Sequence, residues 1–315
     1  GRYEIYNTGH PQEDYFNMYR IDDKSDLKEA VLYVDYKTNI REHNMAAAGR
    51  EAGCGFSKSF VESFLCSDGL PISLSNKYLG DETMRKETAN RDPRLKQLIL
   101  TNDFPTNVTD DLKDSTFVVN EDEFITQHCF TGYRPIKGFN PIYSQALYMK
   151  SSFDGIAYRY AETLLINAEA KAELNTITNA DLDRTVNQLR DRVGMPHLTV
   201  NVGFTDPKWP DWGYSLSPVL QEIRRERCIE LAGEGFRFND LKRWKAGKLL
   251  NNVLTYVGKR KPDGNLAIVY PNYTNPDLSY QAGKSRTWED KMYLYPIPTG
   301  ELQRNPQLLP QNPGW

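Results

Sequence analysis

One loop of the sequence is rich in planar hydrogen-bond donors. Residues 37–53 include Arg41, His43, Asn44 and Arg50. Guanidinium, imidazole and amide groups can donate to hydroxyls or carboxylates, so this loop could bind a polar ligand. On an isolated loop the same residue types are also common on solvated surface, which is the simpler interpretation.

A second loop combines aromatic rings with residues that stiffen the chain. These residues are Phe204, Pro207, Trp209, Pro210, Trp212, Gly213 and Tyr214. An indole ring on a stiff loop presents an apolar face on which the apolar side of a sugar ring can stack. The favoured alternative is that these rings cover the neighbouring helices as a satellite of the hydrophobic core.

Other kinds of site are not supported by residue spacing. The four histidines lie far apart, and the four cysteines show no C-x-x-C spacing, so no zinc site is indicated. No G-x-S-x-G elbow occurs, and the glycine-rich stretch at 53–59 lacks the Gly-Lys pair of a phosphate loop. Cys54 and Cys66 are expected to be unpaired rather than bridged.

Charge and hydropathy exclude two broad classes. The 315 residues include 39 Lys and Arg against 42 Asp and Glu, for a net charge of −3. A nucleic-acid-binding protein that works by bulk positive charge is therefore not indicated. The longest clean apolar run, residues 31–34, is far shorter than the about 20 residues that span a bilayer.

The first half of the chain is expected to be loop-rich and mixed. The pattern predicts a strand at 29–36 and a helix at 57–65, which the Asp-Gly-Leu-Pro sequence at 68–71 follows. A turn at 90–94 leads into an apolar segment at 98–100. Residues 102–123 are acidic and without periodicity, which predicts a surface loop.

From residue 156 the pattern changes to amphipathic helices. Apolar residues at 158, 161, 165, 168 and 172 predict one helical face. A second helix carries apolar residues at 182–193, with a capping box at Thr178 and Asp181 before it. A third begins at Ser217-Pro218 and ends near Leu231, and a short fourth carries Leu241 and Trp244.

Residues 222–243 are the most highly charged part of these helices. Acidic and basic residues alternate there at helical spacing. We interpret them as ion pairs between adjacent helices rather than as catalytic groups.

Ordered motifs along most of the chain resemble the SusD/RagB family. They are DGLPI (68–72), NRDPR (90–94), YRYAETLL (158–165), AEA (168–170), LRDRVG (189–194), EIRRER (222–227), EL (230–231), EGFR (234–237), DLKRW (240–244), YPIP (295–298), NP (305–306) and QNPGW (311–315). The resemblance implies a mostly α fold with tetratricopeptide-like helical hairpins and a loop-rich region with short strands.

The resemblance also implies a function and a place in the cell. Family members are lipoproteins on the outer face of the outer membrane of Bacteroidetes, and they are not enzymes. They pair with a SusC-like TonB-dependent transporter, bind a glycan or, in some members, a peptide, and act as the lid of the transporter barrel. No cofactor is implied.

Family members are usually longer, with a lipid-bearing cysteine and most helical hairpins ahead of the region matched here. We therefore expect this chain to be the C-terminal portion of such a protein, with the anchoring Cys outside it. Residues 1–315 then form a single domain. It has a loop-rich part at 1–155, a helical part at 156–250 and an extended tail at 251–315 that wraps over the surface.

The site hypothesis combines the two loops. Glycan binding would use stacking by Trp209, Trp212 or Tyr143 and hydrogen bonds from Arg41, His43 and Asn44, although contacts from the missing half are an alternative. A helical interaction module that contacts the transporter is the second hypothesis, and a glycoside hydrolase is the least favoured. A structural calcium ion in the acidic loop at 120–123 is left open.

Overall fold

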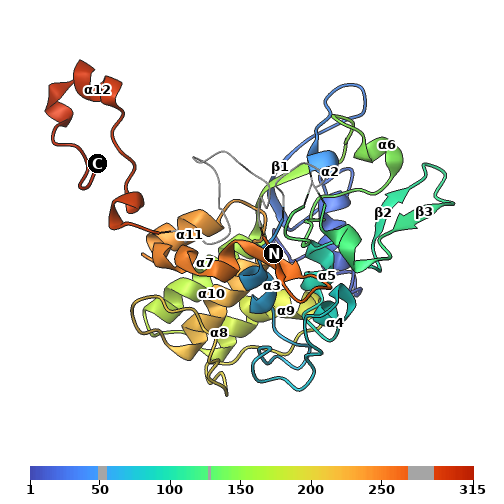
Figure 1. Ribbon diagram of the computed structural model, residues 1–315, viewed down its shortest axis with the longest axis horizontal. Coiled ribbons are helices and arrows are strands. Elements are labelled where there is room, and N and C mark those ends of the chain that lie inside the picture. The colour runs from blue at the N-terminus through green and yellow to red at the C-terminus, as the bar shows by residue number, and fades with distance from the viewer. Residues whose placement is uncertain (49–54, 127–128, 269–286) are drawn as a thin grey trace.

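The computed structural model describes residues 1–48, 55–126, 129–268 and 287–315 (Figure 1). The α-helices are α1 (Asp14–Asn17), α2 (Met45–Ala48), α3 (Lys58–Ser63), α4 (Met84–Thr88), α5 (Arg94–Leu98), α6 (Tyr143–Ala146), α7 (Tyr160–Glu173), α8 (Asn179–Asp183), α9 (Val186–Arg192), α10 (Pro218–Glu230), α11 (Arg237–Arg243) and α12 (Thr299–Arg304). The strands are β1 (Ala30–Val34), β2 (Pro105–Val108), β3 (Ser115–Phe117), β4 (Gly155–Arg159), β5 (Val257–Arg260) and β6 (Leu266–Ile268). The 3-10 helices are η1 (Met18–Arg20), η2 (Glu121–Phe124), η3 (Gly247–Asn251), η4 (Val253–Thr255), η5 (Asp290–Tyr293) and η6 (Pro306–Leu308).

The strand predicted at 29–36 is confirmed as β1. It pairs antiparallel with β4, with Ala30 opposite Arg159 and Val34 opposite Gly155. Tyr158 therefore belongs to a strand and is exposed, so α7 begins later than predicted. The short sheet brings the start of α7 next to residues from the first part of the chain.

Helices α7 to α10 enclose a core of their own. The predicted apolar face of α7 is buried at Ala161, Leu165, Ala168 and Ala172. The second predicted helix is divided into α8 and α9, because the backbone at Thr185 leaves helical geometry. The predicted capping box of Thr178 and Asp181 is present at the start of α8.

A second core fills the first part of the chain. It is built from apolar residues of α1, α3, α4 and α5 together with Phe124, Tyr133 and Phe139. The predicted helix at 57–65 is confirmed as α3, whose first turn is capped because the Ser57 hydroxyl accepts from the backbone N–H of Phe60 at 3.3 Å.

The predicted surface loop at 102–123 is wrong in part. Strands β2 and β3 form an antiparallel hairpin there, with Val108 opposite Ser115. All three residues of β3 are exposed, so the apolar alternation that normally signals a strand is absent.

The tail also differs from the prediction. Residues 251–268 form η4 and the β5–β6 hairpin, and β5 is held by a hydrogen bond from Lys259 N to Thr131 O at 2.8 Å. Figure 1 shows the last segment, with α12 and the C-terminus, standing away from the body rather than wrapping over it.

The predicted ion pairs between helices are confirmed. Arg190 of α9 pairs with Glu226 of α10 at 3.0 Å, and Arg227 of α10 pairs with Asp240 of α11 at 2.9 Å. A buried ion network, defined here as Glu29, Asp92, Arg94, Arg159, Arg192, Glu226, Glu230 and Glu234, joins these helices to the first part of the chain. The charged segment of α10 is therefore scaffold.

Candidate functional site

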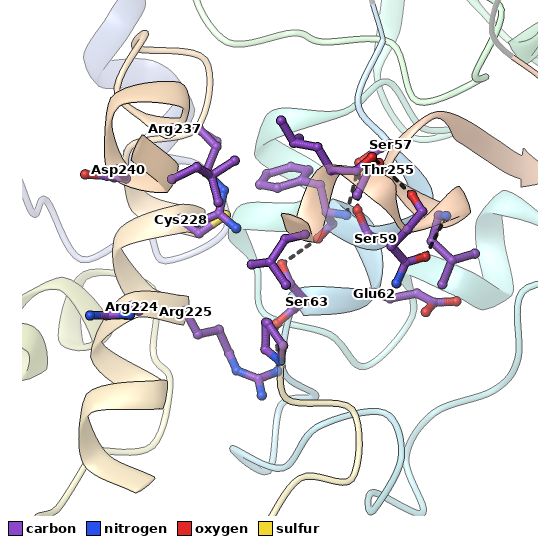
Figure 2. A pocket seen from close by; sticks show the side chains of 18 of the residues that line it. Ser57, Ser59, Glu62, Ser63, Arg224, Arg225, Cys228, Arg237, Asp240 and Thr255 are labelled. Carbon is purple, nitrogen blue, oxygen red and sulfur yellow. Dashed lines mark hydrogen bonds between the residues drawn. The ribbon is translucent and has the colours of Figure 1, made fainter. Parts of the chain in front are cut away.

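A cavity of about 1100 Å³ lies between α3 and the pair α10 and α11. Figure 2 shows Ser57, Ser59 and Ser63 on one side, with Arg225 and Cys228 on the other. The loop at 206–212 and the 3-10 helices η3 and η4 complete the wall. We call this space the α3–α10 cavity.

The α3 side of the cavity combines aromatic rings with hydroxyls. Phe56 and Phe60 line it and stack on each other, with ring centroids 4.5 Å apart and an interplanar angle of 28°. The hydroxyls of Ser57 and Ser59 are 3.0 Å apart, and that of Ser63 donates to the carbonyl of Phe60 at 2.6 Å. An apolar face thus adjoins a row of polar groups.

The two predicted tryptophans have different environments. Trp209 lines the cavity, and its indole N–H donates to Glu222 Oε1 at 2.7 Å, which fixes the ring. Trp212 is only 6% exposed and packs edge-on against Trp244 at 5.4 Å. Trp212 also borders the cavity, but its burial gives it the core role that was the favoured alternative, and it presents almost no face to a ligand.

Arg225 ties the aromatic loop to both walls. Its Nη2 donates to Asp206 Oδ2 at 2.6 Å, and its Nη1 donates to the carbonyl of Ser63 at 3.1 Å. Burial opposes ionisation of Asp206, but hydrogen bonds from Arg225, Lys208 and Ser73 bring its pKa below the ordinary value. This carboxylate is ionised at neutral pH and holds the loop in place.

The other four predicted residues belong to the segment just before α2 and to the start of α6, two helices that contact each other (Figure 1). None of them lines the α3–α10 cavity. The Arg41 guanidinium lies over the ring of Tyr36 at 5.0 Å, and Asn44 Oδ1 accepts from the backbone N–H of Met149 at 3.1 Å. Tyr143 is 52% exposed. The structure therefore divides the six predicted residues between two places.

His43 is held by its neighbours on the surface at α2 and α6. Its Nδ1 accepts from the backbone N–H of Met45 at 3.0 Å, so Nε2 carries the hydrogen that bonds the carbonyl of Phe153 at 2.8 Å. Burial lowers the pKa of the imidazole, which favours this neutral form. Both ring nitrogens are used inside the protein, whereas Arg50 of the same loop lies outside the described residues.

Sequence reasoning missed several residues of the site. Phe56, Phe60 and Arg237 line the cavity, and Tyr148, which is 73% exposed, follows α6 on the other surface. A signal for the first two was available, because F-S-K-S-F at 56–60 places one ring just before the Ser57 N-cap and the other in the first turn of the helix. No comparable signal marks the other two.

Metal and membrane features complete the description. Within the described ranges, no cluster of three or more His, Cys, Asp or Glu residues could hold a metal ion. In the acidic loop at 120–123, Glu121 instead pairs with Lys259 at 3.0 Å, and Asn120 donates to Glu123 at 2.7 Å.

No helix in the part of the chain that the structure describes has the length and apolar character of a membrane span. Cys66 is a free thiol, as predicted, whereas Cys54 lies outside the described residues.

Comparison with known proteins identifies the family. The sequence profile of the SusD family matches residues 8–315. The chain belongs to the SusD family. The mostly helical SusD-like fold expected from the sequence motifs is thereby confirmed.

Individual relatives agree with this assignment. The chain is 33% identical over 166 residues to SusD-like protein P2 of Formosa agariphila, which covers 53% of this chain and 27% of that protein. A SusD-like protein of Bacteroides fragilis superposes with a TM-score of 0.69 at 26% identity, covering 99% of this chain and 59% of that one. A SusD-like carbohydrate-binding protein of the same species gives a TM-score of 0.60 at 24% identity, with coverage of 90% and 54%. The chain thus spans a little over half the length of these solved structures.

Proposed function

We propose that this chain is part of a non-catalytic glycan-binding protein, and that the α3–α10 cavity binds a segment of the glycan. The observation that carries the proposal is that aromatic rings and polar groups meet in one cavity. Phe56, Phe60 and Trp209 supply rings, while Ser57, Ser59 and Thr255 supply hydroxyls. One solved relative of the same fold is described as a carbohydrate-binding protein, which supports the ligand class.

The chemistry of a sugar matches this wall. A pyranose ring has an apolar C–H face that stacks on aromatic rings, and its hydroxyls both donate and accept hydrogen bonds. Ligand cavities commonly measure about 300–1,000 Å³, so a cavity of about 1100 Å³ has room for more than one sugar ring.

Family membership supports a wider role for the whole protein. In our proposal it is anchored to the outer membrane on the extracellular face by a lipid on a Cys outside this chain. It captures an oligosaccharide and acts as the lid of a SusC-like TonB-dependent transporter. A peptide in place of the glycan is the alternative ligand within this role.

A second candidate role is contact with the transporter itself, through the surface at α2 and α6. Apolar side chains are exposed there at Ile40, Met45, Tyr143, Tyr148 and Met149. Grouped apolar residues of this kind are characteristic of protein contacts.

Affinity electrophoresis against a panel of polysaccharides separates these roles. We expect the chain to be retarded by at least one polysaccharide, and we expect Trp209→Ala to remove the retardation. Tyr148→Ala is the matched control, because it removes an exposed ring outside the cavity. Thermal unfolding of both variants checks that the fold is retained.

Three results would count against the proposal. Loss of retardation in Tyr148→Ala alone would place the glycan on the α2–α6 surface. Absence of retardation by any polysaccharide, with binding to the purified transporter, would favour the interaction role. Release of reducing sugar from a retarding polysaccharide would show that the protein is an enzyme.

A further inference from the structure

The wall of the α3–α10 cavity carries more positive than negative groups. Its cationic side chains are Lys208, Arg224, Arg225, Arg227, Arg237 and Lys248, and its anionic side chains are Glu62, Asp206, Asp211 and Asp240. The cavity thus has a formal surplus of two positive charges in a chain whose net charge is −3. The carboxylates of Glu173 and Glu222 lie just outside this lining and pair with Arg224 and Arg225, so only cations without an ion pair could attract an anionic ligand.

Most of these cations are already paired. Arg224 binds Glu173 at 2.7 Å, Arg225 binds Asp206, and Arg227 binds Asp240. Arg237 and Lys248 are both exposed, and neither has an ion pair with any residue in the described ranges. Among the anionic groups of the wall, Asp211 alone likewise has no ion pair with any described residue. Two unpaired cations therefore face the cavity against one unpaired carboxylate.

Arg227 adds a buried donor to this wall. Its side chain is 5% exposed, and its Nε donates to both carboxylate oxygens of Asp240 at 3.1 and 2.9 Å. Its Nη1 is buried and has no hydrogen-bond partner within the described part of the chain. Asp240 also accepts from Arg243 at 2.8 Å, so one carboxylate serves two guanidinium groups. A buried donor without an acceptor is unfavourable. This atom is closed to solvent, however, and Arg227 also borders a second pocket beside α7, so it adds positive charge behind the wall rather than a contact for a ligand.

Arg237 is well placed to meet an anionic group. Figure 2 shows its side chain reaching from the start of α11 toward Cys228, on the face that looks across the cavity to α3. A guanidinium binds a carboxylate or a sulfate through two parallel hydrogen bonds between opposite charges, whereas a neutral sugar hydroxyl offers one acceptor and no opposite charge.

We propose that the α3–α10 cavity selects acidic glycans, whose sugar rings carry a carboxylate or a sulfate ester. The rings of Phe56, Phe60 and Trp209 contact the apolar sugar face, and Arg237 and Lys248 bind the anionic substituent. This inference rests on the proposed function, because it names the class of glycan for that same cavity.

The cavity contains its own reporter group. Cys228 lines it and is partly exposed, whereas Cys66 and Cys129 are buried. In a Cys54→Ser background, the rate at which N-ethylmaleimide modifies Cys228 therefore measures how far the cavity is occupied. We would measure this rate with the full chain alone and with three oligosaccharides: a neutral one (cello-oligosaccharide), a carboxylated one (oligogalacturonate) and a sulfated one (carrageenan oligosaccharide).

We expect an acidic oligosaccharide to slow the modification of Cys228 at least fivefold at a concentration where the neutral one has little effect. Whichever acidic oligosaccharide protects Cys228, the carboxylated or the sulfated one, identifies the anionic group that the cavity binds. We expect Arg237→Gln to raise the oligosaccharide concentration needed for half-maximal protection of Cys228 at least tenfold. Lys248→Gln should raise this concentration by a smaller factor. Arg304→Gln is the control, because it removes another exposed arginine, which lies on α12 outside the cavity.

The outcomes separate this inference from the proposed function. Equal protection by neutral and acidic oligosaccharides, unchanged in Arg237→Gln, would overturn the acidic class while leaving glycan binding intact. Retardation by a polysaccharide in electrophoresis without any protection of Cys228 would overturn the cavity as the site. Failure to bind any glycan in either assay would overturn both.

Discussion

Arg192 and Glu230 form a two-point ion pair at the centre of the molecule. Arg192 Nη2 lies 2.7 Å from both carboxylate oxygens of Glu230, and neither side chain is exposed to solvent. Arg94 and Arg159 also donate to this carboxylate, at 2.9 and 2.6 Å. Burial alone would raise the pKa of Glu230, but the three arginines hold it well below its ordinary value.

Removing the negative charge of Glu230 should destabilise the folded protein more than removing any surface charge. Glu230→Gln leaves three buried guanidinium groups without their shared carboxylate, so we expect the free energy of unfolding to fall by about 3–5 kcal/mol. Urea denaturation measures the change. Glu301→Gln removes an exposed ion pair with Arg304 and should cost less than about 1 kcal/mol. Similar losses for the two variants would contradict the assigned role of the buried network.

Acid should destabilise the protein through Glu234 in a defined pH range. Burial opposes its ionisation, but Arg159 and Lys137 lower its pKa from 4.5 to about 2. The unfolded chain therefore binds a proton more readily than the folded one. The stabilisation is complete above about pH 4.5 and is lost as the pH falls toward 2, for a total of about 3 kcal/mol.

The difference between wild type and Glu234→Gln isolates this contribution. Urea midpoints at pH 7, 5 and 3 should converge for the two proteins as the pH falls, because protonation of Glu234 imitates the substitution. Curves that stay parallel from pH 7 to pH 3 would show that this carboxyl titrates normally.

His43 should be protonated less readily than an ordinary imidazole, because its pKa lies below 6.5. Protonation would place a hydrogen on Nδ1, which now accepts from the N–H of Met45, and burial further disfavours the charged ring. We expect ¹⁵N chemical shifts at neutral pH to show one tautomer with the hydrogen on Nε2, and the ring to titrate below pH 6.5. Because the folded pKa lies below the ordinary 6.5, stability should decline slightly as the pH falls below that value. A ring that titrates at or above pH 6.5 would contradict the hydrogen bonds described here.

Gly258 should not tolerate even one added methyl group. A Cβ at this position would collide with the backbone of Thr131, which accepts the hydrogen bond from Lys259. We expect Gly258→Ala to lower stability by about 1–3 kcal/mol in thermal unfolding. Gly300→Ala is the matched control, because α12 leaves open space around Gly300 and alanine favours a helix. A neutral Gly258→Ala would mean that β5 can move away from Thr131.

Sequence patterns correctly predicted those helix ends and helix faces that depend on residues close together in the chain. The capping box at Thr178, the Ser-Pro start of α10 and the apolar face of α7 are all properties of neighbouring residues. The β2–β3 hairpin was missed because β3 is exposed on both faces and has no apolar alternation. Tyr158 fits the helical spacing of α7, but pairing of β4 with β1 extends the backbone there, and no local pattern contains that partner.

The site was less predictable because it depends on distant segments. Trp209 was identified from its residue type, but its place in a cavity follows from the approach of α3, which lies about 150 residues earlier in the sequence. His43 has a typical ligand-binding chemistry, yet Met45 and Phe153 use both ring nitrogens. Residue type indicated what these groups can do, and tertiary contacts decide whether they remain available.

The buried ion network also sets an order on folding during synthesis. Three of its arginines, Arg94, Arg159 and Arg192, emerge from the ribosome before Glu226 and Glu230 of α10. Until then only Asp92 and Glu29 can pair with them. The nascent chain therefore cannot complete the buried ion network until residue 230 has been made. Until α10 has been made, the final tertiary structure of the earlier residues still depends on this one late helix.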